Sequence, residues 1–317
     1  MTKATSIISI ESTAVKVQTL DAMIDSWLSF IRVSPKTATT YKIAIRQWKK
    51  YCDNNSINQP ARVDVANFLD GLMSAGKSAA TINLYCTAIK LFYRWTALEG
   101  LYPNIADHFK SGVKSSAGHK KDALTAEQGG KLIKSITGNR LVDKRNRAIV
   151  ALMITAGLRT IEISRANVED LVQIGGSWYL YVQGKGRSDK AEKVLIASQV
   201  YDLIRDYLSD RKKYATDDAL FAGCSPRNTG NRLSTQTISK MVKSTLKGIG
   251  LSSKRLTAHS LRHSAACQMI ISGVELRQVQ SVLRHKNINT TLIYLAECDR
   301  LKNVAEQTAA NAFFANI

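Results

Sequence analysis

The 317-residue sequence lacks any long hydrophobic run. Its longest apolar stretch, Ala148 to Gly157, is bounded by Arg147 and Arg159 and is far shorter than the roughly 18–20 residues of a membrane-spanning helix. The apolar run Ile7 to Ile10 is too short for the hydrophobic region of a signal peptide. These absences argue against a membrane protein and predict a soluble, cytoplasmic protein.

Disulfide and metal-binding patterns are also lacking. The five cysteines are odd in number and scattered without C-x-x-C spacing, which predicts reduced, packed thiols. His263 lies one helical turn after His259, but no third metal ligand lies nearby in the sequence. A glycine-rich nucleotide-binding loop is absent as well. We therefore expect no metal and no cofactor.

Acidic residues are scarce relative to basic ones. The chain has 25 Asp and Glu against 45 Lys and Arg, for a net charge of +20. An excess of this size favours a polyanionic partner, most simply nucleic acid. Residues 1–120 contain 15 basic and 8 acidic side chains, and residues 121–317 contain 30 and 17. Because both parts share the excess, we expect a protein that encloses its ligand.

Helical periodicity dominates the first hundred residues. Apolar spacing and capping residues predict one helix over 20–31, a second that starts at Ser34-Pro35, a third from about Asp64 and a fourth capped by Ser78. Such helices form a small bundle. Its tryptophans are expected in the core, with stacking on bases as the alternative: Trp27, Trp48 and Trp95.

The second half mixes helices with short strands. Strands are expected over 171–174, 178–183 and 194–196. A buried helix is expected over 146–157, a helix start near Thr125, and further helices over about 198–213, 235–249, 259–272, 275–284 and 298–314.

A polar, basic, glycine-containing stretch separates the two halves. The expected organisation is a weakly structured segment over 1–18, a helical domain over 19–108, a basic linker over 109–123, and a mixed domain over 124–317 that ends in a helix and tail over 297–317.

Exposed basic, hydroxyl and amide side chains suit phosphate contact, although a solvated surface explains any single one equally well. The candidate DNA-binding residues are Lys36, Thr39, Lys42, Arg46, Lys77, Thr81, Lys90, Lys120, Lys121, Arg187 and Arg284.

Residues suited to phosphodiester chemistry are concentrated in the second half. Breaking this bond without a metal requires cations for the phosphate oxygens, a group that moves protons and a nucleophile. Arginine binds two phosphate oxygens and stays charged, histidine or lysine moves protons, and tyrosine is both nucleophile and leaving group. The short motifs that supply them are Ala156-Gly157-Leu158-Arg159, Gly184-Lys185-Gly186, His259-Ser260-Leu261-Arg262 and Leu283-Arg284-His285, followed by Tyr294.

These four motifs, in this order, resemble those of the tyrosine recombinases, or phage-type integrases, in the small two-domain form of the Xer type. The resemblance covers nearly the whole chain and implies a mainly α fold. A SAM-like helical bundle, the core-binding domain, would precede a mixed α+β catalytic domain with a small antiparallel sheet. The implied activity is site-specific DNA recombination through a 3′-phosphotyrosine and a Holliday junction.

The resemblance also implies a role for each site residue. Tyr294 would be the nucleophile and Lys185 the acid that protonates the leaving 5′ oxygen. His259 would assist proton transfer at the tyrosine. The phosphate would be held by the remaining residues, with Glu162 in support: Arg159, Arg262 and His285. The polar run before Tyr294 fits an accessible residue, and His263 is expected to pack beside the site.

Two departures from the family pattern stand out. Arg284 occupies a position that is usually glycine, where it adds a phosphate contact or is a tolerated surface change. The hairpin around Lys185 is about two residues longer than the commonest family form, so Lys190 or Lys193 competes as the general acid.

The expected partners are double-stranded DNA with paired sites and three further copies of the chain. A tetramer would form by exchange of the C-terminal tail, although docking of that tail on its own protomer is the alternative. Rival functions are a type IB topoisomerase, a DNA-binding regulator without catalysis and a metal-dependent nuclease. The sequence leaves open the target site, and whether the protein integrates a mobile element or resolves replicon dimers.

Overall fold

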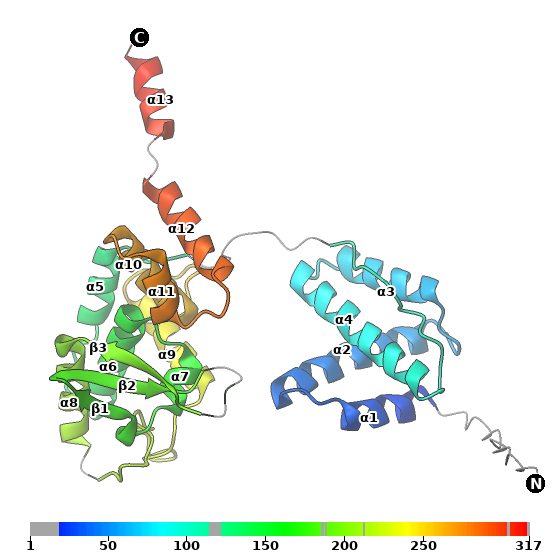
Figure 1. The fold of residues 1–317 in the computed structure, drawn as a ribbon, viewed down its shortest axis with the longest axis horizontal. Helices are drawn as coiled ribbons and strands as arrows, with labels where there is room; N and C mark the ends of the chain where they lie inside the picture. The colour runs from blue at the N-terminus through cyan, green and yellow to red at the C-terminus, as the bar shows by residue number, and fades with distance from the viewer. Residues whose placement is uncertain are drawn as a thin grey trace, which may run out of the picture. The chain divides into compact units, whose positions relative to one another are not determined.

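The computed structural model describes residues 19–113, 122–184, 187, 189–211, 213–302 and 305–315 (Figure 1). The chain divides into two compact units, Met1–Ala117 and Gly118–Ile317, and each has its own hydrophobic core. The segment 1–18 and most of the expected linker lie outside the described residues.

The N-terminal unit is a bundle of helices. Thr19, Ser34 and Ser78 each accept a backbone hydrogen bond from the first turn of the helix that follows them, which fixes the helix starts. The predicted helices are confirmed, with these bounds: α1 Leu20–Phe30, α2 Pro35–Asn54, α3 Arg62–Ser74 and α4 Ala79–Leu98.

Aromatic side chains fill the core of this bundle. Trp27 and Trp48 are at most 1% exposed and Trp95 is 8% exposed. The indole Nε1 of Trp48 donates to the hydroxyl of Tyr93 at 3.0 Å, so the buried polar atoms of both rings are paired. The tryptophans therefore belong to the core, and the alternative that they stack on bases is wrong.

The C-terminal unit combines helices with one small sheet, as predicted. Within the described residues, no helix of either unit is both long and apolar enough to cross a bilayer. The elements of the C-terminal unit are α5 Ala126–Lys134, α6 Leu141–Ala156, α7 Thr160–Arg165, a 3-10 helix Val168–Asp170, β1 Leu171–Ile174, β2 Ser177–Val182, β3 Glu192–Ile196, α8 Ser198–Asp210, α9 Thr235–Gly248, α10 Ala258–Ile271, α11 Leu276–Leu283, α12 Asn289–Lys302 and α13 Ala305–Phe314.

The sheet is antiparallel in the order β1-β2-β3, with Leu180 paired to Leu171 on one side and to Val194 on the other. Leu180 and Val194 are buried in the core that also contains the apolar residues of α6 and α8. The ring of Trp178 stacks on that of Tyr201 of α8, with centroids 3.9 Å apart. The sheet thereby covers one side of the helical core (Figure 1).

The end of the chain differs from the expectation. The last part of the polar run before Tyr294 is the first turn of α12, which begins at Asn289, rather than a free turn. The side-chain oxygen of Asn287 accepts a hydrogen bond from the backbone N–H of Asn289 where the helix begins. The single helix expected over 298–314 is instead the later part of α12 followed by a separate α13. Tyr294 consequently lies inside a helix.

Candidate active site

A sharp turn between α6 and α7 positions Arg159. Gly157 ends α6 with a φ of +62°, in the left-handed region, and an added Cβ there would lie 2.8 Å from a methyl group of Leu283. Both the backbone angle and the close approach favour glycine. Two residues later, Arg159 is the N-cap of α7, and its backbone N–H donates to Glu162 at 2.8 Å.

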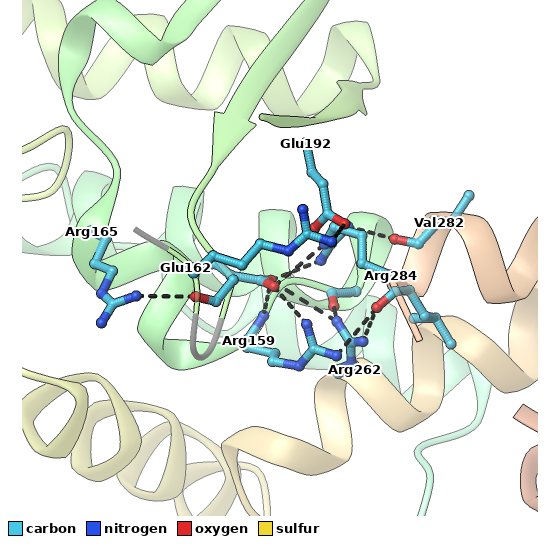
Figure 2. A network of polar contacts seen from close by, with 11 residues as sticks. Arg159, Glu162, Arg165, Glu192, Arg262, Val282 and Arg284 are labelled. Carbon is cyan, nitrogen blue, oxygen red and sulfur yellow. Dashed lines mark hydrogen bonds and ion pairs between the residues drawn. The ribbon is translucent and has the colours of Figure 1, made fainter. Parts of the chain in front are cut away.

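Glu162 is the centre of an ionic network (Figure 2). Its side chain is fully buried, and its carboxylate accepts from Nη1 of Arg159 and from Nη2 of Arg284, each at 2.7 Å. Nη1 of Arg262 lies 4.0 Å away. Burial alone would raise the pKa of Glu162, but the guanidinium groups of Arg284 and Arg159 hold this pKa below its usual value. Glu162 is therefore an anion surrounded by three cations.

Arg262 of α10 is 1% exposed and completes the network. Its Nη1 donates to the carbonyl of Gly157 at 2.5 Å, and its Nη2 donates to the carbonyl of Leu283. Arg159 also reaches the Leu283 carbonyl, at 3.4 Å. Burial, with help from Arg159, lowers the pKa of Arg262 to about 9, which still leaves it charged at neutral pH. Its Nε has no hydrogen-bond partner among the described residues.

Tyr294 lies against this network and is 1% exposed. Its ring packs between those of His263 and His285, with centroids 4.8 and 5.9 Å away. Burial raises the pKa of Tyr294, and Arg262 and Arg159 oppose that rise. The expectation of an accessible tyrosine is wrong for this conformation, because position 294 falls on the apolar side of α12 that packs against α10 and α11.

The histidines differ in their surroundings. His285 is partly buried, and its Nδ1 lies 3.0 Å from the hydroxyl of Thr291. Burial, reinforced by Arg262 and Arg159, lowers the pKa of His285 to about 4, so the ring is neutral at pH 7. His259 is exposed at the start of α10, whereas His263 one turn later is buried against Tyr294, in agreement with the packing role expected of it.

Lys185 lies outside the described residues, but its two competitors do not. The ammonium group of Lys190 contacts Asp170 at 2.6 Å, and that of Lys193 lies 5.1 Å from the ring centroid of Tyr179. Both lysines are therefore engaged by groups outside the arginine network. No set of three or more His, Cys, Asp or Glu side chains in the described residues is arranged to hold a metal ion.

Most candidate DNA-binding residues lie on the surface of the N-terminal unit. Lys77 is exposed near the start of α4, and Thr81 and Lys90 are partly buried on the same helix. Lys120 and Lys121 lie outside the described residues. Four candidates are exposed on α2: Lys36, Thr39, Lys42 and Arg46.

The two candidates in the C-terminal unit are ion-paired. Arg187 pairs with Glu192 at 2.9 Å. The side chain of Arg284 is only 5% exposed and paired with Glu162, so the interpretation of Arg284 as a tolerated surface change is wrong. A direct phosphate contact by Arg284 would require it to exchange partners.

Sequence reasoning missed three parts of the site. The Leu283 carbonyl that accepts from two arginines has no signal in the sequence, because any residue supplies it. The contact between Thr291 and His285 could have been suspected only from their spacing at the start of a helix. The pairing of Arg284 with Glu162 joins residues 122 positions apart, which no local pattern reveals.

A helical unit followed by a unit with clustered arginines, histidines and a tyrosine is the architecture of a DNA strand transferase that uses a tyrosine nucleophile. Comparison with known families agrees: the model "Phage integrase family" matches residues 122–300, and "Phage integrase, N-terminal SAM-like domain" matches residues 24–100. The chain belongs to the phage integrase family.

Known relatives include recombinases from bacteria and archaea. The chain is 29% identical over 289 residues to tyrosine recombinase XerD of Oceanobacillus iheyensis, which covers 87% of this chain and 93% of that protein. It is 28% identical over 272 residues to tyrosine recombinase XerA of Pyrococcus horikoshii, which covers 86% and 88%.

Solved structures have the same fold. The XerH site-specific recombinase in a post-cleavage complex with palindromic difH substrate matches with a TM-score of 0.71 and 26% identity, over 87% of this chain and 79% of that one. The Tn1549 transposon integrase, in complex with circular intermediate DNA, matches with a TM-score of 0.65 over 87% of this chain and 94% of that one. At 18% identity, the second likeness concerns the fold alone.

Proposed function

We propose that this protein is a site-specific DNA recombinase that cuts and rejoins duplex DNA through a 3′-phosphotyrosine. The observation that supports this most directly is the convergence of Arg159 and Arg262 beside Tyr294, around the buried carboxylate of Glu162. Two arginine forks can hold the non-bridging oxygens of a phosphate and stabilise the charge that develops there. The XerD, XerA and XerH relatives are recombinases, which agrees with this reaction.

In the proposed reaction, the Tyr294 oxygen attacks the scissile phosphorus as the bond from phosphorus to the 5′ oxygen breaks. His259 accepts the tyrosine proton, and Lys185 gives a proton to the leaving 5′ oxygen. Neutral His285 donates a hydrogen bond to a phosphate oxygen. Because the phosphotyrosine retains the energy of the broken bond, attack by a 5′ hydroxyl of another strand reverses the step and needs no nucleotide.

In the described conformation the candidate active site is closed, and DNA binding would have to open it. Tyr294 is buried, and the guanidinium groups of Arg159 and Arg262 donate to Glu162 and to the Leu283 carbonyl rather than to a phosphate. A phosphate that replaces these acceptors, together with a displacement of α12, would expose the nucleophile. Docking on DNA thereby becomes a condition for cleavage.

The two units would bind DNA through their cations. On the N-terminal unit, Lys36, Lys42 and Arg46 lie exposed on α2. Each phosphate contact contributes a slope of about −0.9 to the dependence of log affinity on log salt concentration. We expect that a variant with all three replaced by glutamine loses about two to three units of this slope. An unchanged slope would remove α2 from the DNA interface.

Tetramer formation would use the C-terminal tail. Phe313 and Phe314 of α13 are 76% and 72% exposed and lie next to each other in the sequence. A mainly apolar groove of about 390 Å³ between α5, α6 and α10, which includes Ile133, Ile154 and Met269, is suited to receive them from a neighbouring copy. Removal of residues 303–317 would then abolish synapsis, while single-site binding would persist.

The expected location of a recombinase that acts on DNA is the cytoplasm, on the nucleoid.

Covalent trapping tests the proposed reaction. The protein is mixed, in chelator, with nicked suicide duplexes drawn from the DNA that flanks its own gene, beside a Tyr294→Phe control. We expect a denaturant-resistant adduct with the wild type only. Binding without an adduct would favour a DNA-binding regulator. A type IB topoisomerase would form the adduct and relax supercoils as a monomer, but would not exchange strands between two sites. Loss of cleavage in chelator would indicate a metal-dependent nuclease.

A further inference from the structure

Arg284 stands in a backbone conformation that side chains rarely adopt. Its φ is +55°, in the left-handed region, where it ends α11. Glycine is the usual residue there because it has no Cβ to clash with the backbone. Glycine is also the residue that the recombinase pattern has before the third-motif histidine. The arginine therefore occupies a strained position, and its side-chain contacts indicate what offsets the strain.

The side chain of Arg284 contacts the carboxylate of Glu162 and the backbone carbonyl of Val282 (Figure 2). Nη2 of Arg284 donates to Oε2 of Glu162 at 2.7 Å, and Nε lies 3.4 Å from Oε1, so the guanidinium spans both carboxylate oxygens. Arg159 contacts the same carboxylate through Oε1 at 2.7 Å. One fully buried anion thus has two close guanidinium partners, which come from the start of α7 and the end of α11.

This double pairing has a consequence for the reaction. In the proposed function, Arg159 must turn its guanidinium from Glu162 toward the scissile phosphate. A buried carboxylate that loses its partner is strongly destabilising, so this movement would be opposed if Arg159 were the only close partner. Arg284 still covers both oxygens of Glu162 after Arg159 has left. The exchange of partners then leaves no buried charge unpaired.

We propose that Arg284 is a positioning residue that retains Glu162 as its ion-pair partner and so releases Arg159 to bind the scissile phosphate. This inference rests on the proposed recombinase function, and Arg284 acts through Glu162 and Arg159 without touching the DNA. This role explains why an arginine is found at a position that favours glycine. It also predicts that the effects of substitutions at Arg284 and Glu162 are not additive.

The test uses Arg284→Met, Arg284→Lys and Arg284→Gly in the full-length protein. Arg277→Met is the matched control, because Arg277 is an exposed arginine of the same helix. Arg284→Gly removes the charge and also relieves the backbone strain. This variant therefore distinguishes the effect of losing the ion pair from an effect on folding stability. The readouts are DNA affinity and single-turnover cleavage of the suicide duplex, both measured against pH.

We expect Arg284→Met and Arg284→Gly to cleave about tenfold more slowly, with less than about threefold change in DNA affinity. Arg284→Lys should restore part of the rate, because lysine keeps the charge without the planar fork. The groups that face Glu162 are Arg159 from α7, Arg262 from α10 and Arg284 from α11. Without Arg284, Glu162 should gain a proton more readily, so the acid limb of the rate profile should move to higher pH.

A double-mutant cycle separates this role from a purely structural one. In a Glu162→Gln background, Arg284→Met should have almost no further effect on cleavage, because its partner is already gone. Fully additive losses, or a wild-type rate in Arg284→Met, would overturn the inference. An absence of any adduct with the wild-type protein would instead refute the recombinase function itself, so the two failures are distinguishable.

Discussion

The two units of the chain bury different kinds of side chain. Among the described residues of the N-terminal unit, the buried side chains are apolar or aromatic apart from Thr96. In the described part of the C-terminal unit, charged residues are buried as well: Arg145, Glu162, Asp170, Arg211 and Arg262, together with the side chain of Arg284. Buried charges are unfavourable unless they are paired, and here Glu162 and Arg262 lie beside the candidate nucleophile. The interior of the N-terminal unit therefore serves packing alone, whereas the interior of the C-terminal unit also contains the charged groups of the candidate reaction site.

Arg159→Lys, in the reaction site of the C-terminal unit, should have the largest effect on cleavage. Lysine keeps the charge but cannot supply two parallel donors, so we expect single-turnover cleavage to fall about 10²–10³-fold with little change in DNA affinity. Arg205→Lys, an exposed change on α8, serves as the control and should leave the rate unaltered. A comparable loss in the control would show that the assay reports folding rather than chemistry.

Glu162→Gln should destabilise only the C-terminal unit. The substitution leaves three arginines without their shared anion, and we expect a loss of about 3 kcal/mol in the free energy of unfolding. Hydrogen exchange read by mass spectrometry in urea resolves the units separately. Glu127→Gln, at an exposed position of α5, should have an effect of a few tenths of a kcal/mol. Equal loss of protection in both units would contradict the comparison.

Acid should also act mainly on the C-terminal unit. The pKa of His285 is about 4, below its ordinary value of 6.5, so between these values the unfolded chain binds a proton that the folded chain does not. Stability should fall as the pH drops from about 6.5 toward 4. The lowered pKa of Glu162 adds a further loss below its ordinary value of 4.5. His285→Gln should flatten the first part of this decline.

The smallest expected effect belongs to the N-terminal unit. Tyr93→Phe removes the acceptor of the buried Trp48 indole N–H, and we expect a loss of about 1–2 kcal/mol in the stability of that unit. Cleavage by protein that remains folded should be unchanged. Tyr41→Phe, whose ring packs against Trp27 at the edge of the same core, is the control.

The same contrast explains what the sequence could predict. Trp27, Trp48 and the helices that contain them follow from apolar spacing and capping residues, which act within a few positions of one another. Short motifs also predict the candidate site residues Arg159, Arg262, His285 and Tyr294. That these residues lie close together in space depends on the tertiary fold, which the motifs imply only through the family resemblance.

The burial of Tyr294 and the pairing of Arg284 with Glu162 could not be predicted. The burial depends on how α12 packs against α10 and α11, and the ion pair joins α7 to the end of α11. The polar run before the tyrosine indicates exposure, because the sequence does not reveal that a helix begins at Asn289.

The proposed reaction is tested most directly by identifying the atom that links the protein to DNA. The trapped adduct is digested with protease and nuclease, and the modified peptide is sequenced by mass spectrometry. We expect a single nucleotide joined through its 3′ phosphate to the oxygen of Tyr294, with a free 5′ hydroxyl on the departing strand. A phosphate on any other side chain, or a 5′ linkage, would contradict the proposed reaction.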